Sequence, residues 1–190
     1  RRYAEGGADE LLYIDTVASL YGRNQLGGLL EQASNDVFIP ITVGGGIRNA
    51  SDIQNAFQSG ADKVAINTAA IKRPDFISAS VAKYGSQAIV VSIEAKRVNG
   101  GWEAYTENGR ERSGRDAVEW ALEAVERGAG ELLVTSIDRD GTHRGFDIDL
   151  MALIAPKVSV PVTASGGMWT LEHLKEVLTT GRADAVAMAS

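Results

Sequence analysis

The stretch 39–47, Ile-Pro-Ile-Thr-Val-Gly-Gly-Gly-Ile, decides the fold because the chain repeats its pattern at 160–168 as Val-Pro-Val-Thr-Ala-Ser-Gly-Gly-Met. Both copies are short β-branched runs that end in small residues, and Pro40 and Pro161 are 121 positions apart (161 − 40). The flanking sequence repeats at the same interval, since Glu10 and Glu131 are also 121 positions apart (131 − 10). One long repeat with so little drift predicts two homologous halves, each of which ends strands in glycine-rich turns.

Composition limits the classes of protein that fit. With 190 residues, 44% of them hydrophobic and 23% charged, the chain is long enough for one globular domain. A net charge of −6 argues against a broad nucleic-acid surface, although basic residues could gather locally around an anionic ligand. The absence of cysteine and the presence of only two histidines exclude thiolate and histidine-rich metal centres, so we expect no metal and no cofactor. No apolar run reaches the roughly 18 residues of a membrane span, and no signal peptide is visible, which predicts a cytoplasmic protein.

Apolar strands alternate with helices along the chain, a pattern typical of a parallel sheet covered on both faces. We predict helices at 25–35, 50–59, 74–84, 116–127, 147–155 and 171–179, and strands at 10–15, 37–43, 63–67, 88–94, 131–137, 160–164 and 185–189. The polar segment 96–113 is predicted to be a long loop with a small hairpin.

The repeat turns this alternation into an architecture. Every strand has a partner in the other half except the strand at 88–94, whose partner would lie about 121 residues upstream, ahead of the chain. We therefore predict a (β/α)8 TIM barrel built as a two-fold half-barrel repeat. It would form a single domain over 1–190 that lacks the first strand and the last helix. An open doubly wound sheet explains the alternation but not the repeat.

The carboxyl ends of the strands carry the active site in such a barrel. Glycine turns there expose backbone N–H groups to a phosphate, and the following helix adds its positive end. The alternative is a pair of tight turns of the kind that any barrel needs. Because the two turns occupy matched positions, we expect a ligand with a phosphate at each end. The residues predicted at this rim are Asp15, Gly45, Gly46, Asn67, Thr68, Glu94, Ser136, Asp138, Asp140, Gly141, Ser165, Gly166, Gly167 and Ser190.

Charged residues mark both rims. A carboxylate at a strand mouth can act as general acid or base, and the apolar run before Glu94 favours a group held at the barrel mouth; from the residues alone, this role and a helix cap or ion pair stay equally open. Asp138 begins a polar turn, where a helix cap or a surface ion pair is the better interpretation. At the strand starts, Glu10, Lys63 and Glu131 predict a salt-bridge ring on the opposite rim.

Several motifs together resemble the cyclase subunit of imidazole glycerol phosphate synthase, of histidine biosynthesis. They are Thr-Val-Gly-Gly-Gly-Ile at 42–47, Gly-Ala-Asp-Lys-Val-Ala-Ile-Asn-Thr-Ala-Ala at 60–70, Gly-Ser-Gln-Ala at 85–88, Arg-Gly-Ala-Gly-Glu at 127–131, Thr-Ser-Ile-Asp-Arg-Asp-Gly-Thr at 135–142 and Ala-Ser-Gly-Gly at 164–167. The resemblance covers essentially the whole chain and implies a (β/α)8 barrel. It also implies an enzyme that receives ammonia from a partner glutaminase subunit in a heterodimer. The enzyme uses that ammonia to convert a bisphosphate aminoimidazole carboxamide ribonucleotide into imidazole glycerol phosphate and a released purine-pathway ribonucleotide.

The resemblance assigns roles to single residues. The family's acid–base pair is two aspartates, at the ends of the first and fifth strands. The first lies ahead of this chain, and the second falls on Glu94, which keeps the carboxylate but moves it out by one methylene. The phosphate-binding residues fall on Gly45, Gly46, Asn67, Thr68, Asp140, Gly141, Ser165, Gly166, Gly167 and Ser190. The family's ammonia entrance matches Glu10, Lys63 and Glu131, so the resemblance makes the predicted salt-bridge ring an ammonia gate.

Three alternatives remain open at this point. One is a paralogous ammonia-using barrel that amidates a sugar or nucleotide-sugar for surface polysaccharide, suggested by Glu94 and by Trp169 after the second glycine turn. Another is an inactive barrel that serves as a scaffold for the glutaminase. The related isomerase of the same pathway fits less well, because Lys63 and the turn at 136–141 are cyclase-like.

Overall fold

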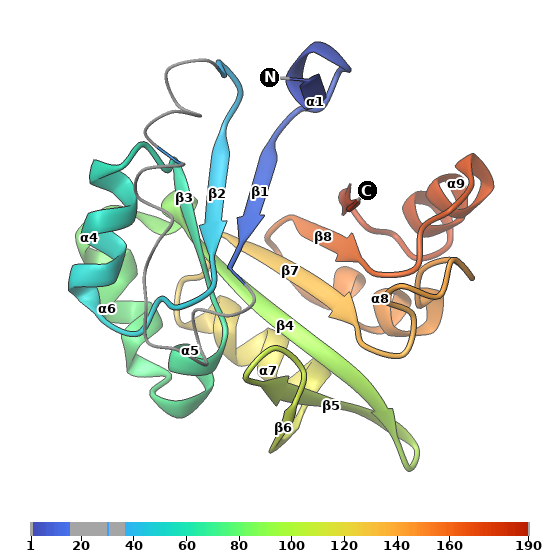
Figure 1. Cartoon of the computed structure of the whole chain (residues 1–190). Helices are drawn as coiled ribbons and strands as arrows, with labels where there is room; N and C mark the ends of the chain where they lie inside the picture. The colour runs from blue at the N-terminus through green and yellow to red at the C-terminus, as the bar shows by residue number, and fades with distance from the viewer. Residues whose placement is uncertain (1, 16–29, 31–36, 190) are drawn as a thin grey trace.

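The computed structural model describes residues 2–15, 30 and 37–189. Seven parallel strands form a curved sheet in the order β1-β2-β3-β4-β7-β8-β9, a nearly closed barrel whose two end strands are β1 and β9 (Figure 1). These strands are β1 (Leu11–Ile14), β2 (Ile41–Gly44), β3 (Lys63–Ile66), β4 (Ile89–Val98), β7 (Glu131–Ser136), β8 (Val162–Ser165) and β9 (Ala185–Ala187). All seven overlap the predicted strands, which confirms the TIM-barrel class.

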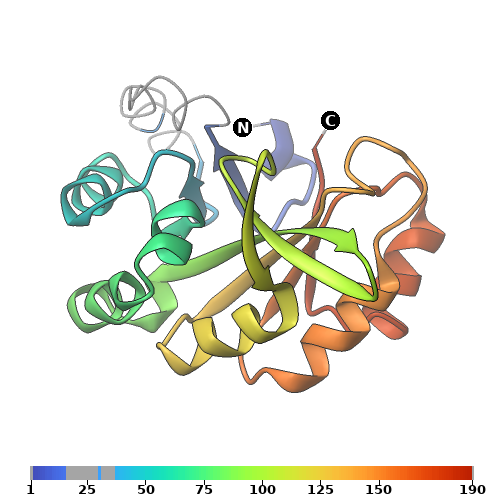
Figure 2. The same ribbon diagram turned by 90° about the horizontal axis from the view of Figure 1, so that it is seen from below.

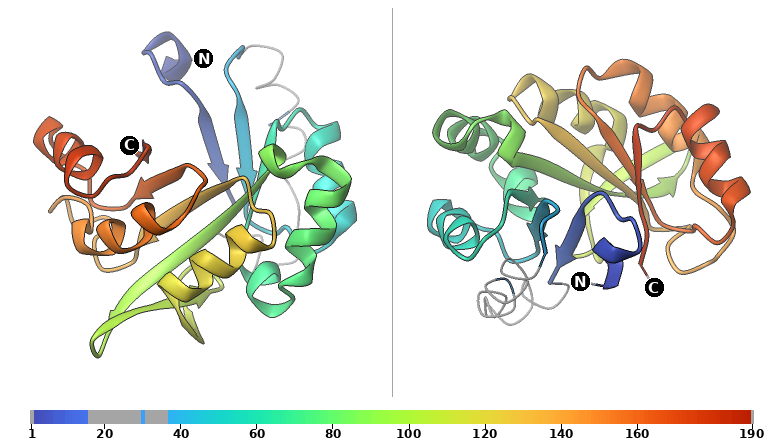
Figure 3. Two further views of the ribbon diagram at one scale, coloured as in Figure 1. Left: turned by 180° about the vertical axis from the view of Figure 1, so that it is seen from behind. Right: turned by 90° about the horizontal axis from the view of Figure 1, so that it is seen from above.

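Helices lie on the outside of this curved sheet, as the view along it shows (Figure 3). They are α4 (Ala50–Gln58), α5 (Thr68–Lys72), α6 (Asp75–Tyr84), α7 (Ala117–Glu126), α8 (Ile148–Ile154) and α9 (Leu171–Thr179), whereas the short α1 (Arg2–Glu5) precedes β1 and has no buried residue. Five of the six predicted helices are present, and the predicted helix at 25–35 lies outside the described residues except for Leu30. None of the helices in the described part of the chain is long and apolar enough to span a membrane.

The two-fold repeat is visible at the level of single hydrogen bonds. In the first half, the backbone N–H of Ile41 donates to the Asp62 carboxylate at 2.8 Å. In the second half, the backbone N–H of Val162 donates to Asp184 at 2.9 Å. Equivalent residues therefore fix equivalent strands, which confirms the repeat predicted from sequence.

The helix after each glycine turn also begins in the same way. Asn49 caps α4 and Thr170 caps α9, and these two residues are again 121 positions apart (170 − 49). Each forms a reciprocal capping box with the third helical residue, Asp52 or His173. Such caps satisfy backbone N–H groups that a helix start leaves unpaired.

Alternation along β4 separates the core from the site. Ile89, Val91 and Ile93 are fully buried in the main core between the sheet and the helices. Val90 lies in a separate small cluster on the inner face of the barrel. Because side chains alternate along a strand, Glu94 shares the inner face with Val90.

The prediction of a long loop at 96–113 was wrong, but the small hairpin predicted within it is present as a pair of antiparallel strands. β4 continues to Val98 and pairs with β5 (Gly101–Thr106), which pairs in turn with β6 (Glu111–Asp116), as an antiparallel extension across the carboxyl side of the barrel (Figure 2). Trp102 is 6% exposed, and the buried Glu103 is satisfied by the Arg112 guanidinium at 2.7 Å. Tertiary burial therefore makes strands from a segment whose polar composition indicates a loop.

Candidate active site

The carboxyl ends of β1 to β4 border a cleft of about 240 Å³. Five of the residues predicted for the phosphate-binding and catalytic roles line it together: Gly45, Gly46, Asn67, Thr68 and Glu94. Glu107 and Asn108, from the tip of the β5–β6 hairpin, form the opposite wall. The first-half site predicted from the sequence is therefore one physical cavity.

The first glycine turn cannot carry side chains. Gly45 and Gly46 have φ angles of 86° and 72°, which favour glycine. A Cβ on Gly45 would lie 2.2 Å from the backbone oxygen of Asp15, because the end of β1 packs directly against this turn. The cleft therefore meets bare backbone at this point, the arrangement that accepts a phosphate.

Three cations that the sequence reasoning did not single out also line the cleft: Arg48, Lys72 and Arg73. Lys72 forms an ion pair with Glu107 at 3.1 Å, and Arg73 donates to the backbone oxygen of Arg48. Although the whole chain is acidic, this side of the rim is locally basic. The only sequence signal was position, since Arg48 follows the glycine turn directly and Lys72 and Arg73 follow the Asn-Thr strand end.

Glu94 is held at the bottom of this cleft. The Asn67 side chain donates to Glu94 Oε2 at 3.0 Å and also to the Tyr105 backbone oxygen at 3.1 Å. Burial raises the pKa of Glu94 above its ordinary value, and the nearby charge of Asp140 adds to this effect. The backbone of Gly109 and the Asn67 amide oppose the shift in pKa without cancelling it. A carboxyl group whose protonated form persists toward neutral pH is suited to give and take protons.

The predicted residues of the second half also come together. Gly166 and Gly167 have φ angles of 94° and 97°, and a Cβ on Gly166 would lie 3.3 Å from the backbone nitrogen of Asp140. The glycine turn after β8 therefore packs against the Asp140-Gly141 turn after β7. Ser190, the remaining predicted member, lies outside the described residues.

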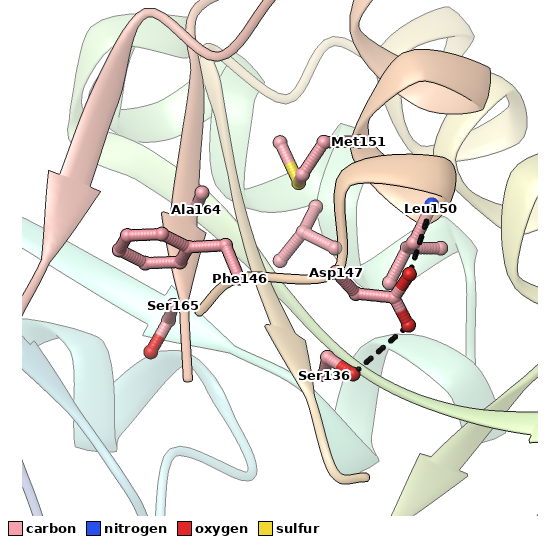
Figure 4. A pocket seen from close by; sticks show the side chains of 8 residues that line it. Ser136, Phe146, Asp147, Leu150, Met151, Ala164 and Ser165 are labelled. Carbon is pink, nitrogen blue, oxygen red and sulfur yellow. Dashed lines mark hydrogen bonds between the residues drawn. The ribbon is translucent and has the colours of Figure 1, made fainter. Parts of the chain in front are cut away.

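Ser136 and Ser165 line a different feature, a crevice too narrow for a water molecule (Figure 4). The Ser136 hydroxyl donates to Asp147 at 3.2 Å, and the same carboxylate accepts from the backbone of Leu150 at 3.2 Å and from Trp102 Nε1 at 3.0 Å. The structure thus gives the Ser136 hydroxyl a partner in the core. The Asp147 carboxylate therefore joins the end of β7 to α8 and to β5.

Other rim residues have contacts of their own. Asp138 accepts from the backbone N–H of Arg97 at 2.7 Å, an exposed hydrogen bond in place of the helix cap or ion pair that the sequence favoured. The exposed Trp169 stacks on His143, with 4.1 Å between the ring centroids. Asp15 follows β1 with its backbone against Gly45, and it does not line the cleft.

At the opposite rim, the predicted salt-bridge ring is present. Lys63 Nζ lies 2.7 Å from Glu10 Oε2 and 2.9 Å from Glu131 Oε2. The hydroxyl of Thr42 donates to Glu10, and that of Thr163 donates to Glu131 at 2.9 Å. Burial alone would lower the pKa of Lys63, but the two carboxylates outweigh burial and raise it. The ammonium group is therefore a stable centre of this ring at neutral pH.

Comparison with known proteins agrees with these features. The whole chain, residues 1–190, matches the family model described as histidine biosynthesis protein. It is 57% identical over 172 residues to the imidazole glycerol phosphate synthase subunit HisF of Legionella pneumophila. That match spans 90% of this chain and 81% of the Legionella protein.

Proposed function

The chain belongs to the histidine biosynthesis protein family, and we propose that it acts there as the cyclase subunit of imidazole glycerol phosphate synthase. The observation that carries this proposal is the buried Glu94 carboxyl at the base of a cleft bordered by a bare glycine turn and three cations. The substrate is a bisphosphate aminoimidazole carboxamide ribonucleotide. Ammonia closes its imidazole ring, and the purine-pathway ribonucleotide is released.

Each part of the site has a task in this reaction. The Gly45-Gly46 turn with Arg48, Lys72 and Arg73 binds one phosphate end of the substrate. The Gly166-Gly167 turn with Asp140 and Gly141 binds the other end. Two anchored ends place the reacting atoms next to Glu94, which moves protons as ammonia adds and the leaving group departs.

Ammonia enters from the other rim. A partner glutaminase would dock where the strands start, and the ring formed by Glu10, Lys63 and Glu131 would gate its ammonia into the barrel. A ring of ion pairs that are only partly exposed is closed at rest. It can open at modest cost because partly solvated ion pairs contribute little stability.

The identity to a cyclase subunit favours this function over sugar amidation and over an inactive scaffold. The decisive measurement supplies the purified full-length protein, including the segment expected to carry the first strand, with the bisphosphate ribonucleotide and an ammonium salt, and follows imidazole glycerol phosphate by chromatography. We expect turnover without any glutaminase. Activation of a glutaminase without product would instead indicate a scaffold, and amidation of an acidic sugar would indicate the paralogous function.

Phosphate binding at the two turns is a separate prediction. Gly46→Asp and Gly166→Asp should each weaken binding of a bisphosphate substrate analogue about tenfold or more, because each adds a negative charge beside the bound phosphate. Isothermal titration calorimetry measures this directly. The matched control is Gly100→Asp, since Gly100 also has a positive φ of 86° but lies in the β4–β5 turn with open space around it. Equal affinity in all three variants would exclude both turns as binding sites.

A further inference from the structure

The turn that joins β5 to β6, residues 107–110, has an unusual backbone. Glu107, Asn108 and Gly109 have successive φ angles of 52°, 56° and 73°. Left-handed backbone is unfavourable for residues with a side chain, and it persists where surrounding contacts over-determine it. Because Glu107 and Asn108 also line the substrate cleft, those contacts bear on the site.

One set of contacts ties the turn to the start of α5. The backbone N–H of Glu107 donates to Thr68 Oγ1 at 3.0 Å, and the Glu107 carboxylate pairs with Lys72 at 3.1 Å. Just before the turn, the Tyr105 backbone oxygen accepts from Asn67 at 3.1 Å. The hairpin tip is thus fastened to the same residues that form the wall of the phosphate cleft.

A second set of contacts reaches the catalytic carboxyl group. The backbone N–H of Gly109 hydrogen-bonds to Glu94, and Asn67 donates to Glu94 Oε2 at 3.0 Å. The charge of Arg110 stabilises the ionised form of Glu94, and Asp140, on the loop after β7, destabilises it. Asn67 therefore donates to the hairpin and to Glu94 with one amide nitrogen, and the backbone of Gly109 gives Glu94 a second hydrogen bond.

We propose that the turn 107–110 is the positioning element for Glu94, and that it works with Asn67 to fix the carboxyl group at one angle to the substrate cleft. The turn touches Glu94 rather than the reacting atoms, so its residues position the acid–base group and do not replace it. This inference rests on the proposed function, because it requires Glu94 to be that group. It adds a role for the β5–β6 extension, which would otherwise be only a cover for the barrel.

Gly109→Ala tests the proposal. A Cβ there would lie 3.1 Å from Ile137 Cδ1 on a left-handed backbone with φ 73°, so alanine strains the turn, and we expect the turn to move relative to Glu94. We expect kcat with ammonium to fall about 10- to 100-fold, the scale for a misplaced catalytic group, with KM nearly unchanged. In the pH profile of kcat, the limb that is set by ionisation of Glu94 should move to higher pH, because the lost N–H hydrogen bond favoured the charged form of the carboxyl group.

Gly100→Ala is the matched control, since it places the same side chain on the same left-handed backbone, at φ 86°, with nothing within 4 Å. It should keep the wild-type kcat and pH profile. Equal losses in the two variants, or a wild-type pH profile in Gly109→Ala, would overturn the proposal.

Substitution of Arg110 is a second test of the proposal, and it leaves the backbone of the turn unchanged. Arg110→Gln should move the same pH limb upward, and Arg110→Lys should restore it, because only the charge near Glu94 differs. If the pH profile of Arg110→Gln matched that of the wild type, this result would contradict the proposed role of the turn in positioning Glu94. Absence of cyclase turnover in the wild-type protein would mean that the proposed function had failed, whereas full turnover in Glu94→Gln would leave that function standing and overturn this inference.

Discussion

In the full-length protein, Glu94→Gln is expected to lower kcat of the ammonium-dependent cyclisation by about 100-fold or more, the range for loss of a general acid–base group. The amide has nearly the same shape but cannot exchange a proton, so KM should stay close to its wild-type value. Steady-state kinetics with ammonium salt measures both constants and leaves the glutaminase out of the comparison. Full turnover in this variant would make Glu94 a structural strand-end carboxylate.

Two variants sharpen this test. Glu94→Asp keeps the carboxyl group, and it should retain activity because the family's aspartate occupies this position in the resemblance. Glu126→Gln removes an exposed carboxylate from the end of α7, far from the cleft, and should change nothing. Loss of activity in all three would indicate damage unrelated to proton transfer.

The raised pKa of Glu94 also makes a prediction about stability. A carboxyl group whose folded-state pKa lies above its unfolded value stabilises the fold at low pH and loses that contribution as pH rises through the folded pKa. Glu94 therefore destabilises the protein near neutral pH. Glu94→Gln should consequently unfold at the same or a higher urea concentration than wild type, in contrast to its loss of activity.

How much of this site the sequence predicts depends on what constrains each residue. Gly45 was predictable because the backbone of Asp15 occupies the space where its Cβ would be, and such a constraint leaves glycine in the sequence. Glu94 was predictable because it follows an apolar run whose residues alternate between the core and the barrel interior, although β4 itself continues to Val98.

Other residues of the site have no recognisable signal in the sequence. Lys72 and Arg73 are ordinary surface residues in any local pattern, and only the folding of α5 against the glycine turn makes them part of the cleft. The β5–β6 hairpin is rich in charge, and its strands form because Trp102 and Ala104 are buried by distant segments. Contacts such as that between Gly109 and Glu94 join residues with no local pattern in common. A single sequence therefore predicts which residues lie at the rim, but not the β5–β6 hairpin that packs against them.

The second large effect is expected from Lys63→Met, which removes the cation at the centre of the salt-bridge ring. In Lys63→Met, the Glu10 and Glu131 carboxylates keep their threonine partners but lose the cation between them, and two like charges face each other in a partly buried space. Removing one partner from a fully buried pair costs about 3–5 kcal/mol, and these partly exposed groups should cost less, about 1–2 kcal/mol in the free energy of unfolding. Urea denaturation at neutral pH measures this loss. It should shrink as the pH falls and the carboxylates are protonated.

The same variant separates a gate from a merely stabilising ring. If the ring controls ammonia entry, Lys63→Met should change the ratio of glutamine-dependent to ammonium-dependent turnover by about tenfold, equivalent to roughly 1.4 kcal/mol in activation free energy. Ammonium added in excess reaches the site by either rim, so its own rate should change little. Thr163→Val is the control, because it removes one hydroxyl from the ring and leaves all three charges in place. A variant that loses stability but keeps the wild-type ratio would assign Glu10, Lys63 and Glu131 to the fold and place the ammonia entrance elsewhere.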